Sequence, residues 1–176
     1  HPIARAIIRD FETNTGLNTL SEVAEATHSP PATKPGIQEA RAIFFTPGTT
    51  GPPKGAYLTE RMIKTCAVCA AMASDATAGD RFLLWEPIYH TSGAQMCVMA
   101  LMEPVILVIV PKFSASLFWN QVRSYRITKM HYIGVILDNR LKPPPETDDR
   151  SHHVPIAFAA VCNPGTWRQF EDRYGV

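Results

Sequence analysis

Residues 43 to 59, IFFTPGTTGPPKGAYLT, combine residue types that can bind phosphate. The segment brings hydroxyls, glycines and one cation close together: Thr46, Gly48, Thr49, Thr50, Gly51, Lys54 and Gly55. Glycine permits a positive φ and lets backbone N–H groups approach phosphate oxygens, while a lysine supplies a mobile cation for polyphosphate. A surface turn is the alternative interpretation. The Walker pattern GxxxxGK[ST] is not matched, because Pro53 and Gly55 replace its second glycine and its magnesium-binding hydroxyl.

A second candidate is His90 in the segment EPIYHTSG, which follows an apolar stretch, residues 81 to 85, typical of a strand. An imidazole placed in a loop after a strand can donate a hydrogen bond to an anion. The alternative is a loop histidine bonded to backbone. The sequence therefore indicates two loops that could share one anionic ligand.

Strands that alternate with helices must position these loops. Apolar runs predict strands at residues 43–45, 81–85, 105–110, 130–133 and 156–161. Helices are expected after Thr59, after Ser114 or Ser116, and after the last two strands. This alternation predicts an α/β fold, a layered and largely parallel sheet flanked by helices. Ligands collect at the carboxyl ends of such strands, so the loops at 46–55 and 87–93 are expected at one edge.

The first 42 residues are predicted to form a separate N-terminal region. Apolar spacing over residues 2–12 predicts an amphipathic helix, and residues 28–37, HSPPATKPGI, form a proline-rich connector. Residues 43–176 would then be the domain that contains the phosphate loop. Within it, residues 143–150, PPPETDDR, are expected to be an exposed loop.

Composition excludes several classes of protein. With 176 residues, 45% hydrophobic residues and a net charge of +1, the chain fits a globular domain and gives no electrostatic argument for nucleic acid or an anionic membrane. The longest apolar run, residues 105–110, is too short to span a bilayer. No basic-then-apolar leader follows His1, so nothing indicates secretion.

Cysteine, histidine and tryptophan residues raise further alternatives. Cys66 and Cys69 form a CxxC, but their alanine-rich helical setting favours small apolar packing residues over redox or zinc chemistry. Cys97 and Cys162 are expected to be buried, reduced thiols, as in a cytosolic compartment. The His152-His153 pair is expected in a solvated loop, since no third ligand is placed. No metal site is assigned. The predicted core residues are Trp85, Phe118, Trp119 and Trp167.

The phosphate segment resembles the loop [YF]TSGTTGxPKG of adenylate-forming enzymes and departs from it only at Pro47, which replaces Ser. EPIYHTSG is similar to the PxxHxxG element that lines the acyl pocket in that superfamily. Residues 111–145, with KFSAS, FW, YIG and LKPPP, are similar to fatty-acid transport proteins, very-long-chain acyl-CoA synthetases and carnitine/crotonobetaine-CoA ligases. The chain is identified as a fragment of the large N-terminal domain of such an enzyme.

The resemblance implies an ATP-dependent carboxylic acid–CoA ligase that acts through an acyl-adenylate. Its partners would be ATP, CoA and a small carboxylic acid such as a fatty acid. The loop residues would bind the β- and γ-phosphates, and His90 would lie beside the acyl carboxylate and the α-phosphate. The magnesium-binding Glu of a YGxTE element is expected beyond Val176, with a catalytic Lys later. The isolated chain is therefore expected to be inactive. A cytoplasmic location, or one peripheral to an intracellular membrane, is implied.

Two departures from the family pattern favour a different interpretation, a degenerate paralogue that keeps the fold and binds acyl groups or nucleotide without catalysis. Pro47 removes a hydroxyl and a backbone N–H from the phosphate loop. In residues 159–165, AAVCNPG, Ala159 and Val161 replace glycines and would crowd the ligand. An unrelated phosphate-binding protein, such as a P-loop NTPase, is a third alternative, and the Walker mismatch argues against it.

Overall fold

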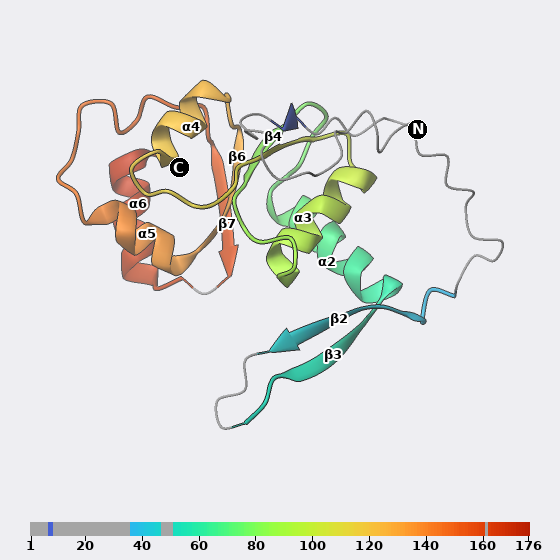
Figure 1. Ribbon diagram of the computed structural model, residues 1–176. Coiled ribbons are helices and arrows are strands. Elements are labelled where there is room, and N and C mark those ends of the chain that lie inside the picture. The colour runs from blue at the N-terminus through green and yellow to red at the C-terminus, as the bar shows by residue number, and fades with distance from the viewer. Residues whose placement is uncertain (1–6, 9–35, 47–50, 161) are drawn as a thin grey trace, which may run out of the picture.

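The computed structural model describes residues 7–8, 36–46, 51–160 and 162–176, which form two separate sheets (Figure 1). The larger sheet has five strands in the order β1-β5-β4-β6-β7, and every pairing in it is parallel. Its strands are β1 (Ile7–Ile8), β4 (Arg81–Leu84), β5 (Ile106–Ile109), β6 (Lys129–Ile133) and β7 (Ile156–Ala160). The predicted α/β fold is confirmed, and the strands expected near residues 81, 105, 130 and 156 are all present.

Helices pack on both faces of the parallel sheet. They are α2 (Glu60–Ala73), α3 (Thr91–Met102), α4 (Phe118–Ser124), α5 (Gly134–Leu141) and α6 (Pro164–Tyr174). Successive side chains of a strand point to opposite faces. Phe82 and Leu84 of β4 accordingly join a core with residues of α2 and α3, whereas Leu83 joins a core with α4, α5 and α6. The sheet is therefore buried on both sides, as parallel sheets require.

Strands β2 (Ala40–Thr46) and β3 (Lys54–Thr59) form an antiparallel hairpin outside the parallel sheet. The hairpin extends away from the body of the molecule (Figure 1). Its register sets Phe45 opposite Gly55 and Thr46 opposite Lys54. The expected position of the loop at the carboxyl end of a parallel strand is thus wrong. The connection is too short for the crossover that parallel pairing needs, so the chain turns straight back.

The predicted helix start at Thr59 is confirmed, whereas the start predicted at Ser114 or Ser116 is wrong. The Thr59 hydroxyl accepts a hydrogen bond from Met62 N–H at 3.2 Å and caps α2. Helix α4 begins only at Phe118, and its N-cap residue makes no side-chain capping bond. Ser114 and Ser116 hydrogen-bond to each other instead, with their hydroxyl oxygens 3.3 Å apart.

The predicted N-terminal helix is wrong at the two residues of it that the structure describes. Ile7 and Ile8 form β1 and pair with Val108 and Ile109 at the edge of the sheet. Two consecutive β-branched residues fit that apolar edge well. The rest of residues 1–35 lies outside the described residues. Strand β2 begins at Ala40, so the boundary expected after residue 42 falls inside a strand.

Several expectations about single side chains can be checked. Phe118 and Trp119 are buried and Trp85 packs against the same core, but Trp167 is 50% exposed, so its core assignment is wrong. All four cysteines are free thiols; Cys69 is exposed, and Cys66, Cys97 and Cys162 are only half-buried. Burial raises the pKa of the Cys97 thiol. No helix in the described part of the chain is long and apolar enough to cross a membrane.

Candidate functional site

The parallel sheet has a point where its connections reverse direction, between β4 and β6. From β4 the chain passes through α3 to β5 on one side, and from β6 through α5 to β7 on the other. Ligands of open α/β sheets bind in the crevice outside the carboxyl ends of the strands at such a point. The segment that follows the carboxyl end of β4 contains Glu86, Pro87 and His90. The topology therefore places the predicted His90 segment where a ligand is expected.

His90 is the N-cap residue of α3, with extended backbone angles of φ −97° and ψ 149°. Its Nδ1 accepts the Ser92 N–H at 3.3 Å and lies 2.7 Å from the Ser92 hydroxyl. Because an accepting Nδ1 carries no proton, the neutral ring holds its proton on Nε2. The ring is exposed. The alternative interpretation of His90, a hydrogen bond to the backbone, is therefore confirmed for Nδ1. Nε2 is the ring nitrogen that can donate to an anion.

The turn before His90 depends on a glycine. His90 N–H donates to the Pro87 carbonyl oxygen at 2.9 Å. A Cβ at Gly93 would lie 2.3 Å from that oxygen and 2.7 Å from the Pro87 carbonyl carbon. Real Cβ atoms do not approach backbone so closely, so only glycine fits here without a shift of the turn. This contact explains physically why a glycine is needed at position 93, which the sequence motif alone does not explain.

The hairpin and the beginning of α3 pack together. A small apolar cavity of ≈ 10 Å³ between them is lined by Phe44 and Leu58 of the hairpin, Ile63 and Cys66 of α2, and Thr91, Ala94 and Gln95 of α3. Thr91 directly follows His90, and Phe44 lies two residues before the end of β2. The structure thus brings together the two elements that carry the predicted phosphate loop and His90.

The described loop residues lie at the far end of the hairpin. Thr46 ends β2 and Lys54 begins β3, directly opposite each other. Gly51 and Gly55 are exposed, and Gly48, Thr49 and Thr50 lie outside the described residues, as does Pro47. Among the described glycines φ is positive at Gly79 and Gly175, so the positive φ expected in the loop is absent at Gly51 and Gly55.

Gly55 has a steric role of a different kind. A Cβ at this position would lie 2.9 Å from Cγ2 of Ile43. A larger residue would push on the neighbouring strand, while a Cβ at Gly51 would meet nothing within 4 Å. Of the two, only Gly55 is required by contacts within the hairpin.

Sequence reasoning missed a buried pair beside the site. His131 Nδ1 of β6 hydrogen-bonds to Oε1 of Glu86, and the two residues are 6% and 5% exposed. Glu86 Oε2 is also buried and has no hydrogen-bond partner among the described residues. The one sign of this pair in the sequence is the position of Glu86, an acidic residue between an apolar strand and Pro87. Nothing in the sequence pairs it with a histidine so far along the chain.

The segment that departs from the family pattern forms a helix start in this structure. Asn163 caps α6, because its Oδ1 accepts the Gly165 N–H at 2.8 Å, and Pro164 occupies the first turn. Burial, with a contribution from Cys162, raises the pKa of the neighbouring Tyr132 to about 12. Val161 lies outside the described residues. The expected crowding of a ligand by Ala159 and Val161 stays a prediction.

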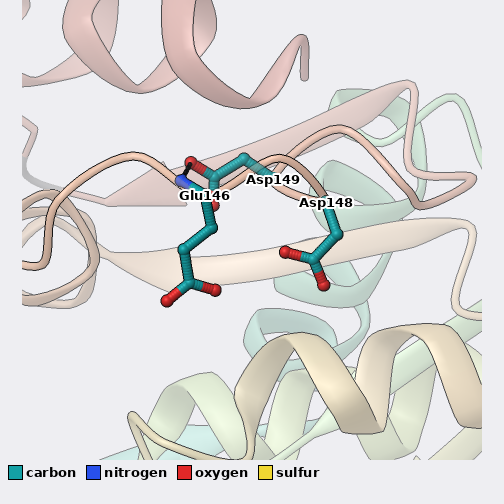
Figure 2. Close-up of side chains that lie close together, drawn as sticks. All are labelled: Glu146, Asp148 and Asp149. Carbon is teal, nitrogen blue, oxygen red and sulfur yellow. Dashed lines mark hydrogen bonds between the residues drawn. The ribbon is translucent and has the colours of Figure 1, made fainter.

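Three carboxylates in the loop after α5 come close together, those of Glu146, Asp148 and Asp149 (Figure 2). Figure 2 shows the Asp149 carboxylate turned back toward the Glu146 backbone, whose N–H donates to its Oδ2 at 3.0 Å. Arg173 Nε lies 2.7 Å from Asp149 Oδ2, and Arg123 Nη2 lies 3.1 Å from Asp148 Oδ2. Arginines therefore pair with two of the three carboxylates, Asp148 and Asp149, and these ion pairs attach the loop to α4 and α6.

Two expectations about this region hold only in part. Residues 143–150 form a loop that is mostly exposed, as predicted, but Asp149 is 7% exposed because its ion pair with Arg173 holds it inward. His152 is half-buried and stacks on Trp119, with ring centroids 4.7 Å apart, so it is not solvated. Burial lowers the pKa of His152. His153 is exposed, as expected.

The ion pair of Asp149 predicts an acid-sensitive contribution to stability. Burial raises the pKa of Asp149, but the hydrogen bonds from Arg173 and from Glu146 N–H outweigh it and lower this pKa overall. A depressed pKa in the folded state adds stability that is present above the unfolded value, about 3.9, and lost as the pH falls through the folded value.

Asp149→Asn should therefore lower the free energy of unfolding at pH 7 by about 1.5 kcal/mol. It should also remove part of the loss of stability below about pH 4. Urea unfolding of the full-length protein across pH measures both effects. Asp148→Asn is the control, since its half-exposed ion pair should contribute little. Equal effects of the two substitutions would contradict the role given to Asp149.

Comparisons with known proteins agree with this geometry. A family model described as AMP-binding enzyme matches residues 3–176. The chain is 35% identical over 133 residues to mouse long-chain fatty acid transport protein 6, covering 75% of this chain and 21% of that protein. It is 31% identical over 166 residues to the medium/long-chain-fatty-acid–CoA ligase FadD6 of Mycobacterium tuberculosis, covering 90% and 28%. The chain thus spans about a quarter of the length of these relatives.

Solved structures show the same fold. The ATP-bound structure of MatB from Rhodopseudomonas palustris superposes with a TM-score of 0.75 at 23% identity, covering 89% of this chain and 31% of that one. The N-terminal domain of FACL13 from Mycobacterium tuberculosis gives a TM-score of 0.72 at 20% identity, covering 87% and 38%.

Proposed function

Because this chain belongs to the family of AMP-binding enzymes, we propose that it is part of a ligase that activates a carboxylic acid with ATP. The product of that step would be an acyl-adenylate, from which the acyl group passes to coenzyme A. The names of the relatives favour a fatty acid or a related acid as substrate. The matched residues, 3–176, would belong to the large domain of this enzyme, acting in the cytoplasm or at the surface of an intracellular membrane.

The packing of the hairpin against the first turn of α3 carries this proposal. Adenylation must bring a carboxylate and a triphosphate together, so cations and fixed donors are needed at their meeting point. Lys54 and the hydroxyls of Thr46, Thr49 and Thr50 would bind the β- and γ-phosphates. Gly48, Gly51 and Gly55 would leave room for the phosphate oxygens.

His90 is proposed to act at the other end of the triphosphate. Its Nε2–H would donate to the carboxylate or the α-phosphate while Nδ1 stays bonded to Ser92. The magnesium ligand is proposed to lie outside this chain. The carboxylate cluster near Asp149 does not fit that role, because two of its three carboxylates, Asp148 and Asp149, are paired with Arg123 and Arg173.

The proposal is tested in the full-length protein by pyrophosphate release. ATP should be cleaved only when a carboxylic acid is added, and long- and medium-chain fatty acids are the first to compare. Acid-independent release, or no release with any acid, would contradict the ligase assignment. The second outcome would favour the inactive paralogue, which Pro47 and the substituted glycines at Ala159 and Val161 support.

Lys54→Ala should weaken the use of ATP in the active full-length protein. Loss of one charged hydrogen-bonding group to a phosphate should raise KM for ATP about 10- to 100-fold. Initial rates at varied ATP concentration measure this effect. Lys64→Ala is a matched control, because Lys64 lies on α2 and pairs with Glu60. A normal KM for ATP in the Lys54 variant would remove Lys54 from the phosphate site.

A further inference from the structure

The Glu86–His131 pair joins the two strands at the point where the connections of the sheet reverse. Glu86 lies two residues beyond the end of β4, and His131 lies in the middle of β6, opposite Phe158 of β7. The side chains are 1% and 5% exposed. Trp85 adds a second link, since its Nε1 lies 3.4 Å from the His131 carbonyl oxygen. The end of β4 is thus fastened to β6 by side chains as well as by the sheet.

The position of Glu86 is linked to that of His90 through backbone contacts. The Glu86 carbonyl oxygen would lie 3.0 Å from a Cβ at Gly93, and the Pro87 oxygen even closer. The same Pro87 oxygen accepts the His90 N–H at 2.9 Å. Any movement of Glu86 therefore moves the turn that sets both the His90 ring and the first turn of α3.

Stability alone does not account for a buried acid at this position. Burying a carboxylate and an imidazole costs free energy unless both are fully hydrogen-bonded, and Glu86 Oε2 has no partner among the described residues. An apolar pair of similar volume would fill the space without that cost. Unlike an apolar contact, the Glu86–His131 hydrogen bond is directional, so it fixes the orientation of one side chain relative to the other.

We propose that Glu86 and His131 are positioning residues that hold the His90 turn at the crevice between β4 and β6. This proposal rests on the proposed function for its kinetic effect, although not for its structural one. Neither residue contacts the reacting groups. Both act through the Pro87 carbonyl and the cap of α3.

The kinetic experiment compares Glu86→Leu with Glu86→Gln in the full-length protein. Glu86→Leu removes the acceptor for His131 and should lower kcat for adenylation about 10- to 100-fold, the size expected of a misplaced group, with KM for ATP unchanged. Glu86→Gln keeps an acceptor oxygen of the same reach and should restore most of kcat. If the glutamine variant were as slow as the leucine variant, the negative charge rather than the position would matter, and the proposal would be wrong.

Asp80→Asn is the matched control at the opposite end of β4. Asp80 Oδ1 accepts the Thr128 hydroxyl at 2.6 Å, so Asp80 also ties β4 to the beginning of β6. Its substitution should lower the unfolding midpoint and leave kcat unchanged. If Asp80→Asn and Glu86→Leu lost kcat in the same proportion to the fall of their unfolding midpoints, Glu86 would have only a structural role.

A spectroscopic readout separates this proposal from the ligase assignment. The ¹⁵N resonances of the His90 ring report its tautomer, and Glu86→Leu should shift them while Asp80→Asn does not. This holds even if the protein does not adenylate any acid, in which case only the proposed function fails. His131→Gln and His131→Leu give the same comparison from β6 if Glu86→Leu does not fold. Unchanged His90 resonances in the leucine variants would overturn the positioning role.

Discussion

Replacing His90 with alanine in the full-length protein should lower kcat for adenylation by about 10²–10³. The loss should exceed any rise in KM for ATP, because the Nε2–H is proposed to meet charge that develops in the transition state. Rapid-quench or steady-state measurement of acid-dependent pyrophosphate release gives both constants.

The N-cap position of His90 calls for a variant that separates capping from catalysis. Asparagine is a good N-cap residue and should keep the bond to Ser92 N–H, but it lacks the Nε2–H that is proposed to donate to the ligand. His90→Asn should therefore fold like the wild type and be nearly as slow as His90→Ala. If asparagine restored kcat, His90 would serve the helix alone. His153→Ala, at an exposed histidine, should have no effect.

Gly93→Ala should be the most damaging small substitution near the site. The added methyl would lie 2.3 Å from the Pro87 carbonyl oxygen, so the turn or α3 must move. Overpacking of this kind costs about 1–3 kcal/mol of stability, and the displaced His90 should lower kcat as well. Chemical denaturation and adenylation kinetics of the full-length protein measure the two effects.

The matched control for Gly93 is Gly165, which lies in the first turn of α6. A Cβ there would lie 3.3 Å from the Asn163 side-chain oxygen, a contact that a side chain can adjust. Alanine also favours helix over glycine. Gly165→Ala should therefore be close to neutral. Equal losses in the two variants would mean that the Pro87 contact is not the cause.

The sequence predicted the parts of the fold that depend on local patterns. The apolar runs in β4 and β5 and the cap at Thr59 are each readable within a few residues, and all three are present. His90 was identified by its motif and found at the start of α3. The edge strand at Ile7 and Ile8 was predicted as helix, because its partner β5 lies far along the chain and local spacing resembled a helical period.

The features that were not predicted depend on which segments, distant in the sequence, become neighbours in the fold. The strand predicted at residues 43–45 was assigned to the parallel sheet because an apolar strand gives no sign of its partner's direction, and its partner β3 was not predicted. The Glu86–His131 pair joins the segment after β4 to β6, and these two strands become neighbours only through the crossover by way of β5. Asp149 looked exposed in a polar loop, and only the folded chain brings Arg173 to it.

The register of the hairpin limits how this protein can vary in length over evolution. Since Phe45 faces Gly55 and Thr46 faces Lys54, an insertion within either strand would turn every later side chain to the opposite face. An insertion between residues 47 and 53 leaves those pairs intact. The pairing of the strands therefore holds Lys54 opposite Thr46 and does not by itself set the length of the connection. If Thr49 and Thr50 bind phosphate as proposed, selection on the length of this segment has two sources: strand pairing on either side of the loop, and the ligand within it.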